Sequence, residues 1–373
     1  MLFELRDVFL AGSVSGMSGS GSGAAVVRPR LAGVSLKIAD GFTAVLGYSG
    51  AGKSSLLSVL AGYEEPTSGS IERGMQLQGG ALPCFWVPQS CGLWAHLSVQ
   101  RHLELVGAGN ADEILHVFDL WERRAALPGE LSQGERSRLS VVRALASGAR
   151  VLLMDEPLAH VDPVRKPRYW RELERLVRAS GASLIFSTHE PAVVLRTAER
   201  VVCLRDGGVW HESLVEDLYE RAPCRELGEL LGPVNWLDGT LAKALGLELA
   251  DGSGAGVGGG CGVCVRPERL RLVRVTESGE RAGGSASGRA VVGGVVQVRN
   301  SQVIGGLAET VVGVSLSGSG SGTGTAAGEC RLLHGLDWGA VGEGIGSGGG
   351  WGLSAGEWVR VEYCPVEVSG VCR

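Results

Sequence analysis

Short apolar runs alternate with helical periodicities over the first 230 residues. Three of the runs are almost continuously apolar, which predicts strands buried on both faces, at 42–46, 151–154 and 183–187. Elsewhere in this part, apolar residues recur at the spacing of helices with one buried face, at 55–62, 134–146 and 167–179. Strands that alternate with helices predict an α/β layer structure.

The pattern changes after about residue 235. Alternating segments rich in β-branched residues predict strands at 263–275, 290–298, 310–316 and 358–368. Glycine, with 60 of 373 residues, gathers in patches that indicate loop insertions, at 12–23, 252–260, 279–288, 317–328 and 342–352. The first patch interrupts a predicted hairpin. We therefore expect a small all-β C-terminal domain, a barrel or a sandwich, and divide the chain into domains 1–230 and 231–373.

Length, charge and cysteine content narrow the class of protein. A chain of 373 residues suggests two or three domains, and a net charge of −5 without a basic stripe gives no support to nucleic-acid binding. No apolar run approaches the roughly 18 residues of a membrane helix, and the first residues carry charges where a signal peptide is apolar. The nine cysteines form no disulfide framework. We expect a soluble, cytoplasmic protein.

Cys261 and Cys264 are the only close cysteine pair. Their spacing is that of half a zinc site, but no second pair follows at metal spacing. Small apolar strand residues are the interpretation that we favour.

Residues 47–54 form the pattern G-x-x-x-x-G-K-[ST], which is a phosphate-binding loop between a predicted strand and a predicted helix. Its glycines let successive backbone N–H groups turn toward phosphate oxygens. Lys53 would place its charge on the β- and γ-phosphates, and Ser54 would offer its hydroxyl to Mg²⁺. The predicted binding residues are Gly47, Tyr48, Ser49, Gly50, Ala51, Gly52, Lys53, Ser54 and Ser55. The predicted ligands are therefore ATP, or another nucleoside triphosphate, and Mg²⁺.

Asp155 and Glu156 close the apolar run 151–154. A carboxylate at the end of a buried strand can hold Mg²⁺ through water, and the next carboxylate can polarise an attacking water. His189 ends the run 184–188, where a histidine beside a γ-phosphate would link that phosphate to the base. Gln89 could reach Mg²⁺ or the attacking water. The alternatives are that Asp155 and Glu156 are an ordinary acidic pair after a strand and that His189 is a structural histidine.

The segment 131–135, Leu-Ser-Gln-Gly-Glu, opens a predicted helix. Ser132 just before the helix start can cap the helix, and the helix N-terminus attracts anions. A plain capping motif is the alternative to an anion site.

In this order along the chain, the phosphate loop, Gln89, segment 131–135, segment 152–157, Asp162 and His189 resemble the ATP-binding subunits of ABC transporters. The resemblance covers roughly residues 30–215. It implies a P-loop ABC-type nucleotide-binding domain with a helical subdomain at about 90–148. It also implies that Glu156 is the catalytic base, that His189 is the switch histidine, and that Asp162 faces a second subunit.

Members of that family work as head-to-tail dimers, which implies that Ser132, Gln133 and Gly134 contact the γ-phosphate bound to the other subunit. This chain departs from the usual family pattern at Gln133, where glycine is common, and at Glu135, where glutamine is common. A Cβ at position 133 would crowd the approach to the nucleotide. Phe3 and Phe9 are the candidates to stack on adenine.

Segments 232–236 and 265–272 resemble the C-terminal extension of the sulfate, molybdate, iron and sugar importer ATPases. This likeness implies transmembrane permease partners, an indirect link to a solute-binding protein, a peripheral place on the cytoplasmic face of the membrane, and a regulatory C-terminal domain. The phosphate loop of this chain, residues 47–54, looks most like that of the molybdate importers. The expected solute is therefore an oxyanion such as molybdate or sulfate, or iron. Leu93, Trp94 and His96 are candidate permease contacts. A soluble ABC ATPase acting on nucleic acid or ribosomes, a nucleotide-binding regulator and an exporter ATPase are the alternatives.

Overall fold

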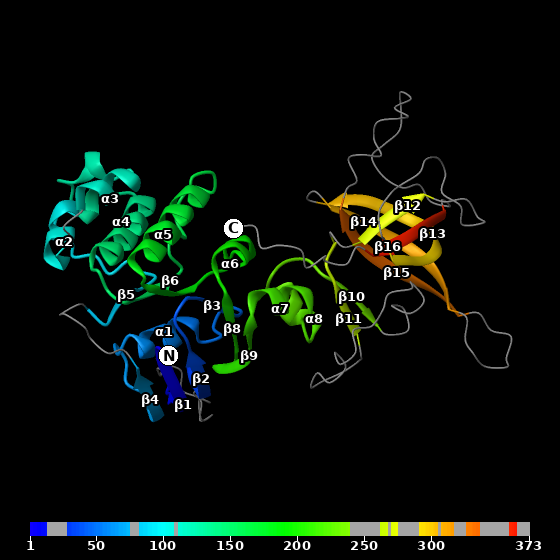
Figure 1. The fold of residues 1–373 in the computed structure, drawn as a ribbon, viewed down its shortest axis with the longest axis horizontal. Coiled ribbons are helices and arrows are strands. Elements are labelled where there is room, and N and C mark those ends of the chain that lie inside the picture. The colour runs from blue at the N-terminus through cyan, green and yellow to red at the C-terminus, as the bar shows by residue number, and fades with distance from the viewer. Residues whose placement is uncertain are drawn as a thin grey trace, which may run out of the picture. The chain divides into compact units, whose positions relative to one another are not determined.

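The computed structural model describes residues 1–12, 28–74, 82–107, 111–238 and 262–267, together with the strand backbones at 270–274, 291–304, 307–316, 326–335 and 358–363. The chain divides into two compact units, Met1–Glu216 and Asp217–Arg373 (Figure 1). The functional division at residues 230 and 231 remains a prediction.

A six-stranded sheet forms the centre of the first unit (Figure 1). Its strands, in spatial order, are β5 (Cys84–Val87), β6 (Val151–Asp155), β7 (Ser183–Ser187), β3 (Phe42–Leu46), β8 (Arg200–Arg205) and β9 (Gly208–Leu214). All neighbours are parallel except β8 and β9. Every residue of β3, β6 and β7 is buried, which confirms the three strands predicted from continuous apolar runs.

A three-stranded antiparallel sheet of β2 (Leu31–Ile38), β1 (Phe3–Leu10) and β4 (Ser68–Arg73) shares one core with the central sheet. Helix α1 (Lys53–Leu60) contributes Leu56 and Leu57 to this core, and β6 contributes Leu153. The helix that follows the phosphate loop is therefore packed into the apolar core that both sheets share.

A helical segment lies between β5 and β6 in the sequence. It contains α2 (Val99–Val106), α3 (Ala111–Val117), the 3₁₀ turns Trp121–Arg123 and Pro128–Glu130, and α4 (Gln133–Ala146). Ser98 caps α2 by accepting a hydrogen bond from the Arg101 amide, and Gly107 ends it in the left-handed conformation. Helices α5 (Lys166–Ser180) and α6 (Pro191–Thr197) complete the unit, and α4 and α5 confirm the helices predicted at 134–146 and 167–179.

The second unit contains most of α7 (Val215–Glu220), α8 (Arg225–Glu229) and two antiparallel sheets. Strands β10 (Asn235–Asp238) and β11 (Gly262–Val265) form one sheet. The other sheet follows the order β12 (Leu270–Arg274), β16 (Trp358–Tyr363), β13 (Val291–Ile304), β14 (Leu307–Leu316) and β15 (Ala326–Gly335). Closure of these strands into a barrel remains a prediction.

Two details of this unit differ from the sequence expectation. The single strand predicted at 263–275 is split into β11 and β12, because Pro267 follows β11 and cannot donate to a ladder. The buried Arg266 stands at this break and donates to the carbonyls of Tyr219, Gly228, Gly232 and Pro233. Strand β15 begins inside the glycine patch predicted as a loop at 317–328.

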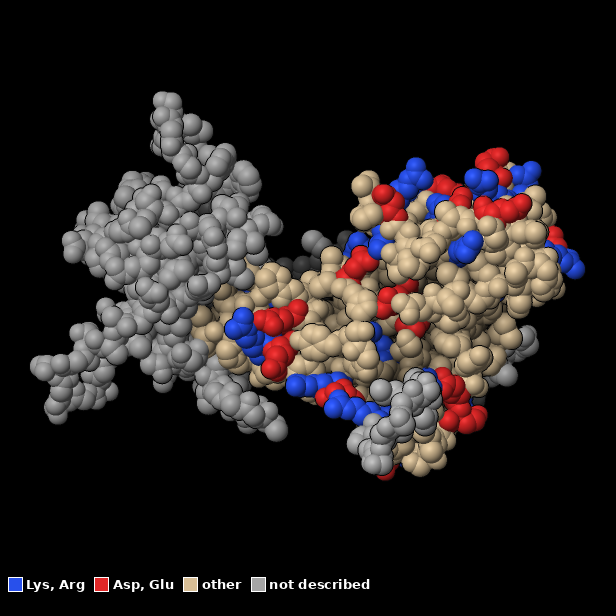
Figure 2. Space-filling model, turned by 180° about the vertical axis from the view of Figure 1, so that it is seen from behind, with Lys and Arg blue, Asp and Glu red and all other residues tan. Residues whose placement is uncertain are grey.

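Acidic and basic side chains are interspersed over the described residues of the face in Figure 2. Exposed ion pairs such as Arg101–Glu104 and Arg225–Glu229 each add little stability. Within the described residues, no helix combines the length and the apolar character that crossing a membrane requires.

Candidate functional site

Four adjacent parallel strands bring the predicted site residues to one edge of the central sheet. Strands β5, β6, β7 and β3 are neighbours in that order, and each is followed directly by a predicted site segment. Gln89 follows β5, Glu156 follows β6, His189 follows β7, and the phosphate loop follows β3. The carboxyl edge of a parallel sheet is the usual place for a ligand site in α/β proteins.

The phosphate loop depends on glycine at two positions. Gly47 has a φ of 146°, and a Cβ there would lie 2.5 Å from the Leu204 carbonyl oxygen. Gly52 has a φ of 105°, and a Cβ there would lie 2.8 Å from the Arg30 carbonyl oxygen. Tyr48, Ser49, Gly50 and Ser54 are exposed, whereas Ala51 and Ser55 are buried. The loop therefore presents an open rim on a rigid base.

Lys53 is buried inside this loop, with 7% of its surface exposed. Its ammonium donates to the Gly47 carbonyl at 2.8 Å and to the Tyr48 carbonyl at 3.1 Å. Burial lowers the pKa of Lys53 below its usual value, and the charges of Glu156 and Asp155 oppose that shift. A buried cation among the backbone N–H groups of a glycine loop suits a phosphate, so the residues present fit a nucleotide.

Asp155 and Glu156 are held by a residue that the sequence did not reveal. The Ser187 hydroxyl, fully buried at the end of β7, donates to Asp155 Oδ1 at 2.6 Å and accepts from the Glu156 amide at 2.9 Å. Glu156 has a φ of 51° and Leu158 a φ of 63°, so the loop after β6 turns sharply through left-handed backbone. A serine at the end of a strand is ordinary in sequence and gave no signal.

The three predicted catalytic side chains meet at one carboxylate. His189 Nε2 contacts Glu156 Oε1, and the Gln89 amide donates to Glu156 Oε2 at 3.4 Å. The Glu156 side chain is 17% exposed and the His189 side chain is 54% exposed, so the carboxylate is the more buried partner and the imidazole faces solvent. Asp155 is buried beside them, and a carboxylate in that place fits a Mg²⁺ ion held together with the Ser54 hydroxyl.

Ser132 forms a capping box, so the capping motif given as the alternative to an anion site is present in the structure. Its hydroxyl accepts from the Glu135 amide at 3.2 Å and donates to Glu135 Oε2 at 2.8 Å. The same carboxylate accepts from the Ser132 amide at 2.8 Å and lies 3.4 Å from Arg123 Nε. The Ser132 hydroxyl, which the resemblance assigns to a phosphate of the partner, is therefore hydrogen-bonded to Glu135 instead. Gln133, the next residue, is exposed.

The start of α4 touches the loop after β6 within the same chain. A Cβ on Gly134 would lie 3.0 Å from the His160 carbonyl oxygen, so this contact favours glycine. Asp162 accepts from the Val164 and Arg165 amides at 2.9 and 3.3 Å, which opens α5. The Asp162 side chain thus serves its own backbone here.

Lys166 joins two loops of the site and was not predicted. Its ammonium donates to Glu190 Oε1 at 2.7 Å and to the Ala159 carbonyl at 3.4 Å. Glu190 directly follows His189, and Ala159 belongs to the loop after Glu156. Lys166 therefore ties the loop after Glu156 to the residue that follows His189.

The segment after Gln89 is fastened to the helical segment. The buried Arg143 of α4 donates to the Gly92 and Cys91 carbonyls at 2.7 and 3.2 Å. The Trp94 amide donates to His102 Nε2 at 3.0 Å, and the Trp94 side chain stays 43% exposed. Trp94 can therefore meet a partner while its backbone is fixed.

Of the two candidates for adenine stacking, Phe3 is fully buried in the core, so this expectation was wrong. Phe9 is 36% exposed and remains a candidate. Cys261 lies outside the described residues, so the zinc alternative for the pair with Cys264 remains untested.

Comparison with known proteins now identifies the class. The family model described as ABC transporter matches residues 31–159. The spermidine/putrescine import ATP-binding protein of Ruegeria pomeroyi is 32% identical over 269 residues, which are 65% of this chain and 73% of that protein. The chain belongs to the ABC transporter family, among the import ATP-binding proteins, and it is an ABC-type ATPase.

Two further proteins are similar to parts of this chain. The molybdenum import ATP-binding protein of Azotobacter vinelandii is 38% identical over 202 residues, which are 48% of this chain and 55% of that protein. The solved structure of a dimeric bacterial ABC transporter cassette is 24% identical, with a TM-score of 0.48, and covers 57% of this chain and 99% of that chain.

Proposed function

We propose that this protein couples ATP hydrolysis to solute import through transmembrane permease subunits. The observation that carries the proposal is the meeting of Lys53, Asp155, Glu156 and His189 at the ends of adjacent parallel strands. A buried cation for phosphates, a buried carboxylate for a metal and a second carboxylate for water are the groups that phosphoryl transfer to water requires.

Each residue has a proposed role. Lys53 and the loop 47–52 bind the β- and γ-phosphates, and Ser54, Gln89 and Asp155 hold Mg²⁺, which neutralises phosphate charge when bound. Glu156 accepts the proton of the attacking water, because its carboxylate is oriented by both Gln89 and His189. His189 is exposed enough to leave Glu156 and contact a γ-phosphate when a nucleotide enters.

The working unit is a homodimer in our proposal. Ser132, Gln133 and Gly134 of one subunit would face the γ-phosphate bound to its partner, with Asp162 beside the junction. Ser132 and Gln133 are exposed in the single chain, and Asp162 is exposed as well, so all three are accessible to a second copy. Catalysis then depends on closure of the dimer.

The protein would act as a peripheral subunit on the cytoplasmic face of the membrane. Trp94, exposed on a segment that Arg143 fixes, is the proposed anchor of the permease, with Leu93 and His96 beside it. A solute-binding protein would reach the ATPase only through the permease. The C-terminal residues 231–373 are proposed to regulate transport.

For the solute, we propose an oxyanion of the molybdate class. The likeness to a molybdenum import protein, at 38% identity, supports this class. The likeness to spermidine/putrescine import proteins favours a polyamine as the second candidate.

The proposed function is tested by recovery of partners from native membranes. Tagged Glu156→Gln protein is incubated with Mg-ATP and detergent-solubilised membranes, and bound proteins are identified by mass spectrometry. A polytopic permease is expected, and transport assays of its solute then separate oxyanion from polyamine. Recovery of ribosomes, DNA or soluble proteins alone would favour a soluble ABC ATPase or a regulator.

A further inference from the structure

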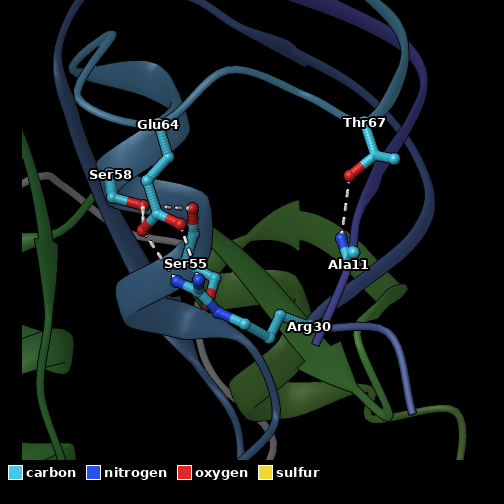
Figure 3. Close-up of polar contacts among 6 residues, drawn as sticks. All are labelled: Ala11, Arg30, Ser55, Ser58, Glu64 and Thr67. Carbon is cyan, nitrogen blue, oxygen red and sulfur yellow. Dashed lines mark hydrogen bonds and ion pairs between the residues drawn. The ribbon is translucent and has the colours of Figure 1, made fainter. Parts of the chain in front are cut away.

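Arg30, which belongs to no motif of the nucleotide site, forms a network of hydrogen bonds along helix α1 (Figure 3). Its Nε donates to Ser55 Oγ at 3.0 Å. Its two terminal nitrogens donate to the two Glu64 oxygens at 2.6 and 2.7 Å. Ser58 Oγ also donates to Glu64 Oε1, at 2.9 Å. The guanidinium therefore joins the first turn of α1 to the segment that follows the helix.

The backbone of Arg30 supports the phosphate loop as well. Arg30 directly precedes β2, and its amide donates to the Leu10 carbonyl at 2.8 Å, which fixes the residue to β1. Its carbonyl oxygen lies 2.8 Å from where a Cβ on Gly52 would stand, so it packs on the glycine that ends the loop. One residue thus contacts the loop through its backbone and the helix through its side chain.

The direction of these hydrogen bonds leaves one proton available. A guanidinium only donates, so Ser55 Oγ must be the acceptor of the bond from Arg30 Nε. The Ser55 hydroxyl proton is then free to be donated elsewhere. Side chains of a helix lean toward its N-terminus, which is the phosphate-loop end of α1. Ser55 is buried at that end, two positions after Lys53, so its hydroxyl stands beside the loop in which we propose that the phosphates bind.

Glu64 decides how Arg30 can act. The Arg30 guanidinium lowers the pKa of Glu64 through its hydrogen bonds to that carboxylate, so the pair stays ionised at neutral pH. The side chains of Arg30 and Glu64 are 36% and 29% exposed, which screens the pair only in part. Glu64 takes one N–H of each terminal nitrogen and Ser55 takes the Nε–H, so Ser55 is the partner of Arg30 that lies in the first turn of α1.

We propose that Arg30 is a positioning residue of the nucleotide site, which turns the Ser55 hydroxyl proton toward a nucleotide phosphate. The inference rests on the proposed function, since it requires that the loop 47–54 binds the nucleotide. It adds a specific prediction: Arg30 and Ser55 contribute to ATP affinity as one unit.

The test is the dissociation constant of Mg-ATP, measured by titration calorimetry on the full chain. Arg30→Gln and Ser55→Ala are each expected to weaken binding about tenfold, the size of one hydrogen bond to a charged group. The double variant should bind no more weakly than either single variant, because the two changes remove one interaction. Ser55→Thr, which keeps a hydroxyl, should recover the affinity that Ser55→Ala loses. Arg101→Gln, which breaks the exposed pair with Glu104, is the matched control and should leave affinity unchanged.

Three results would overturn the proposal. They are wild-type affinity in Arg30→Gln, additive losses in the double variant, and wild-type affinity in Ser55→Ala. The last variant removes only a hydroxyl, so it decides the matter even if Arg30→Gln fails to fold. Lys53→Ala distinguishes failure of the proposed nucleotide site from failure of the proposed role of Arg30. If Lys53→Ala binds ATP normally, the proposed nucleotide site is wrong. If it loses ATP binding, the site stands and the Arg30 and Ser55 variants decide the role of Arg30.

Discussion

The Ser187 hydroxyl donates a 2.6 Å hydrogen bond to the Asp155 carboxylate, across the adjacent strands β7 and β6. The same oxygen accepts from the Glu156 amide, so one buried side chain fixes both carboxylates of the site. Ser187→Ala leaves the buried Asp155 oxygen without this donor, which costs about 1–3 kcal/mol, and it removes the acceptor of the half-buried Glu156 amide.

We expect Ser187→Ala to lower ATP turnover more than tenfold and to raise the Mg²⁺ concentration needed for half-maximal ATP binding. Ser187→Thr keeps the hydroxyl and should restore both quantities. Steady-state phosphate release and a Mg²⁺ titration of ATP binding measure them. Equal turnover in the alanine variant and the unchanged protein would show that Ser187 does not position the carboxylates.

Glu135 places a negative charge where the family resemblance puts a phosphate. Glu135→Gln removes that charge but keeps an oxygen that can accept from the Ser132 amide. We expect ATP turnover to rise a few-fold, because a carboxylate repels the γ-phosphate of the partner, while stability falls by about 0.5 kcal/mol through the lost interaction with the helix N-terminus. Glu130→Gln, which changes the equivalent capping contact to the Leu127 amide, is the control. Lower turnover in Glu135→Gln would contradict a repulsive role.

His102 makes the stability of the helical segment depend on pH. Its Nδ1–H donates to the Ser98 carbonyl and its Nε2 accepts from the Trp94 amide, so the ring is neutral in this arrangement. Burial lowers the pKa of His102, the charges of Arg143 and His96 lower it further, and the bond to Ser98 opposes the shift. A proton added to Nε2 would face the Trp94 N–H, so protonation of His102 breaks this hydrogen bond.

Because the folded pKa lies below the unfolded one, the unfolded state binds more protons and stability falls as pH decreases from about 6.5 toward the folded value. Thermal unfolding between pH 7.5 and 5 should show this loss, with a slope of at most about 1.4 kcal/mol per pH unit from one proton. His102→Gln should flatten it, whereas His116→Gln, at an exposed position, should not. An unchanged slope in His102→Gln would assign the pH dependence to other groups, such as His211, whose pKa burial also lowers.

A homodimer that closes on ATP should be trapped when hydrolysis is blocked. Glu156→Gln with saturating Mg-ATP is expected to double its mass in light scattering, and Lys53→Ala/Glu156→Gln should stay monomeric because the phosphates lose their cation. A Glu156→Gln protein that remains monomeric with bound ATP would count against the composite site.

The local parts of the site were predictable from sequence. The phosphate loop is a continuous segment whose shape follows from its own glycines, and the strands before Lys53, Glu156 and His189 are continuous apolar runs. Parallel pairing then brings their carboxyl ends together without further information.

The contacts that hold these groups in place were not predictable, because each joins residues far apart in the chain. Ser187 lies 32 positions from Asp155, Arg30 lies 34 from Glu64, and Lys166 lies 24 from Glu190. None has a local pattern. Glu135 is the exception, since Ser-x-x-Glu before a helix predicts a capping box, and this pattern was available in the sequence.

The most direct test of the account is phosphate release from Mg-ATP by Glu156→Gln, measured beside its ATP affinity. If Glu156 is the base, turnover should fall at least about a hundredfold, within the range attributed to general base catalysis, while the dissociation constant of ATP changes little. Turnover equal to that of the unchanged protein would contradict the assignment of the catalytic site.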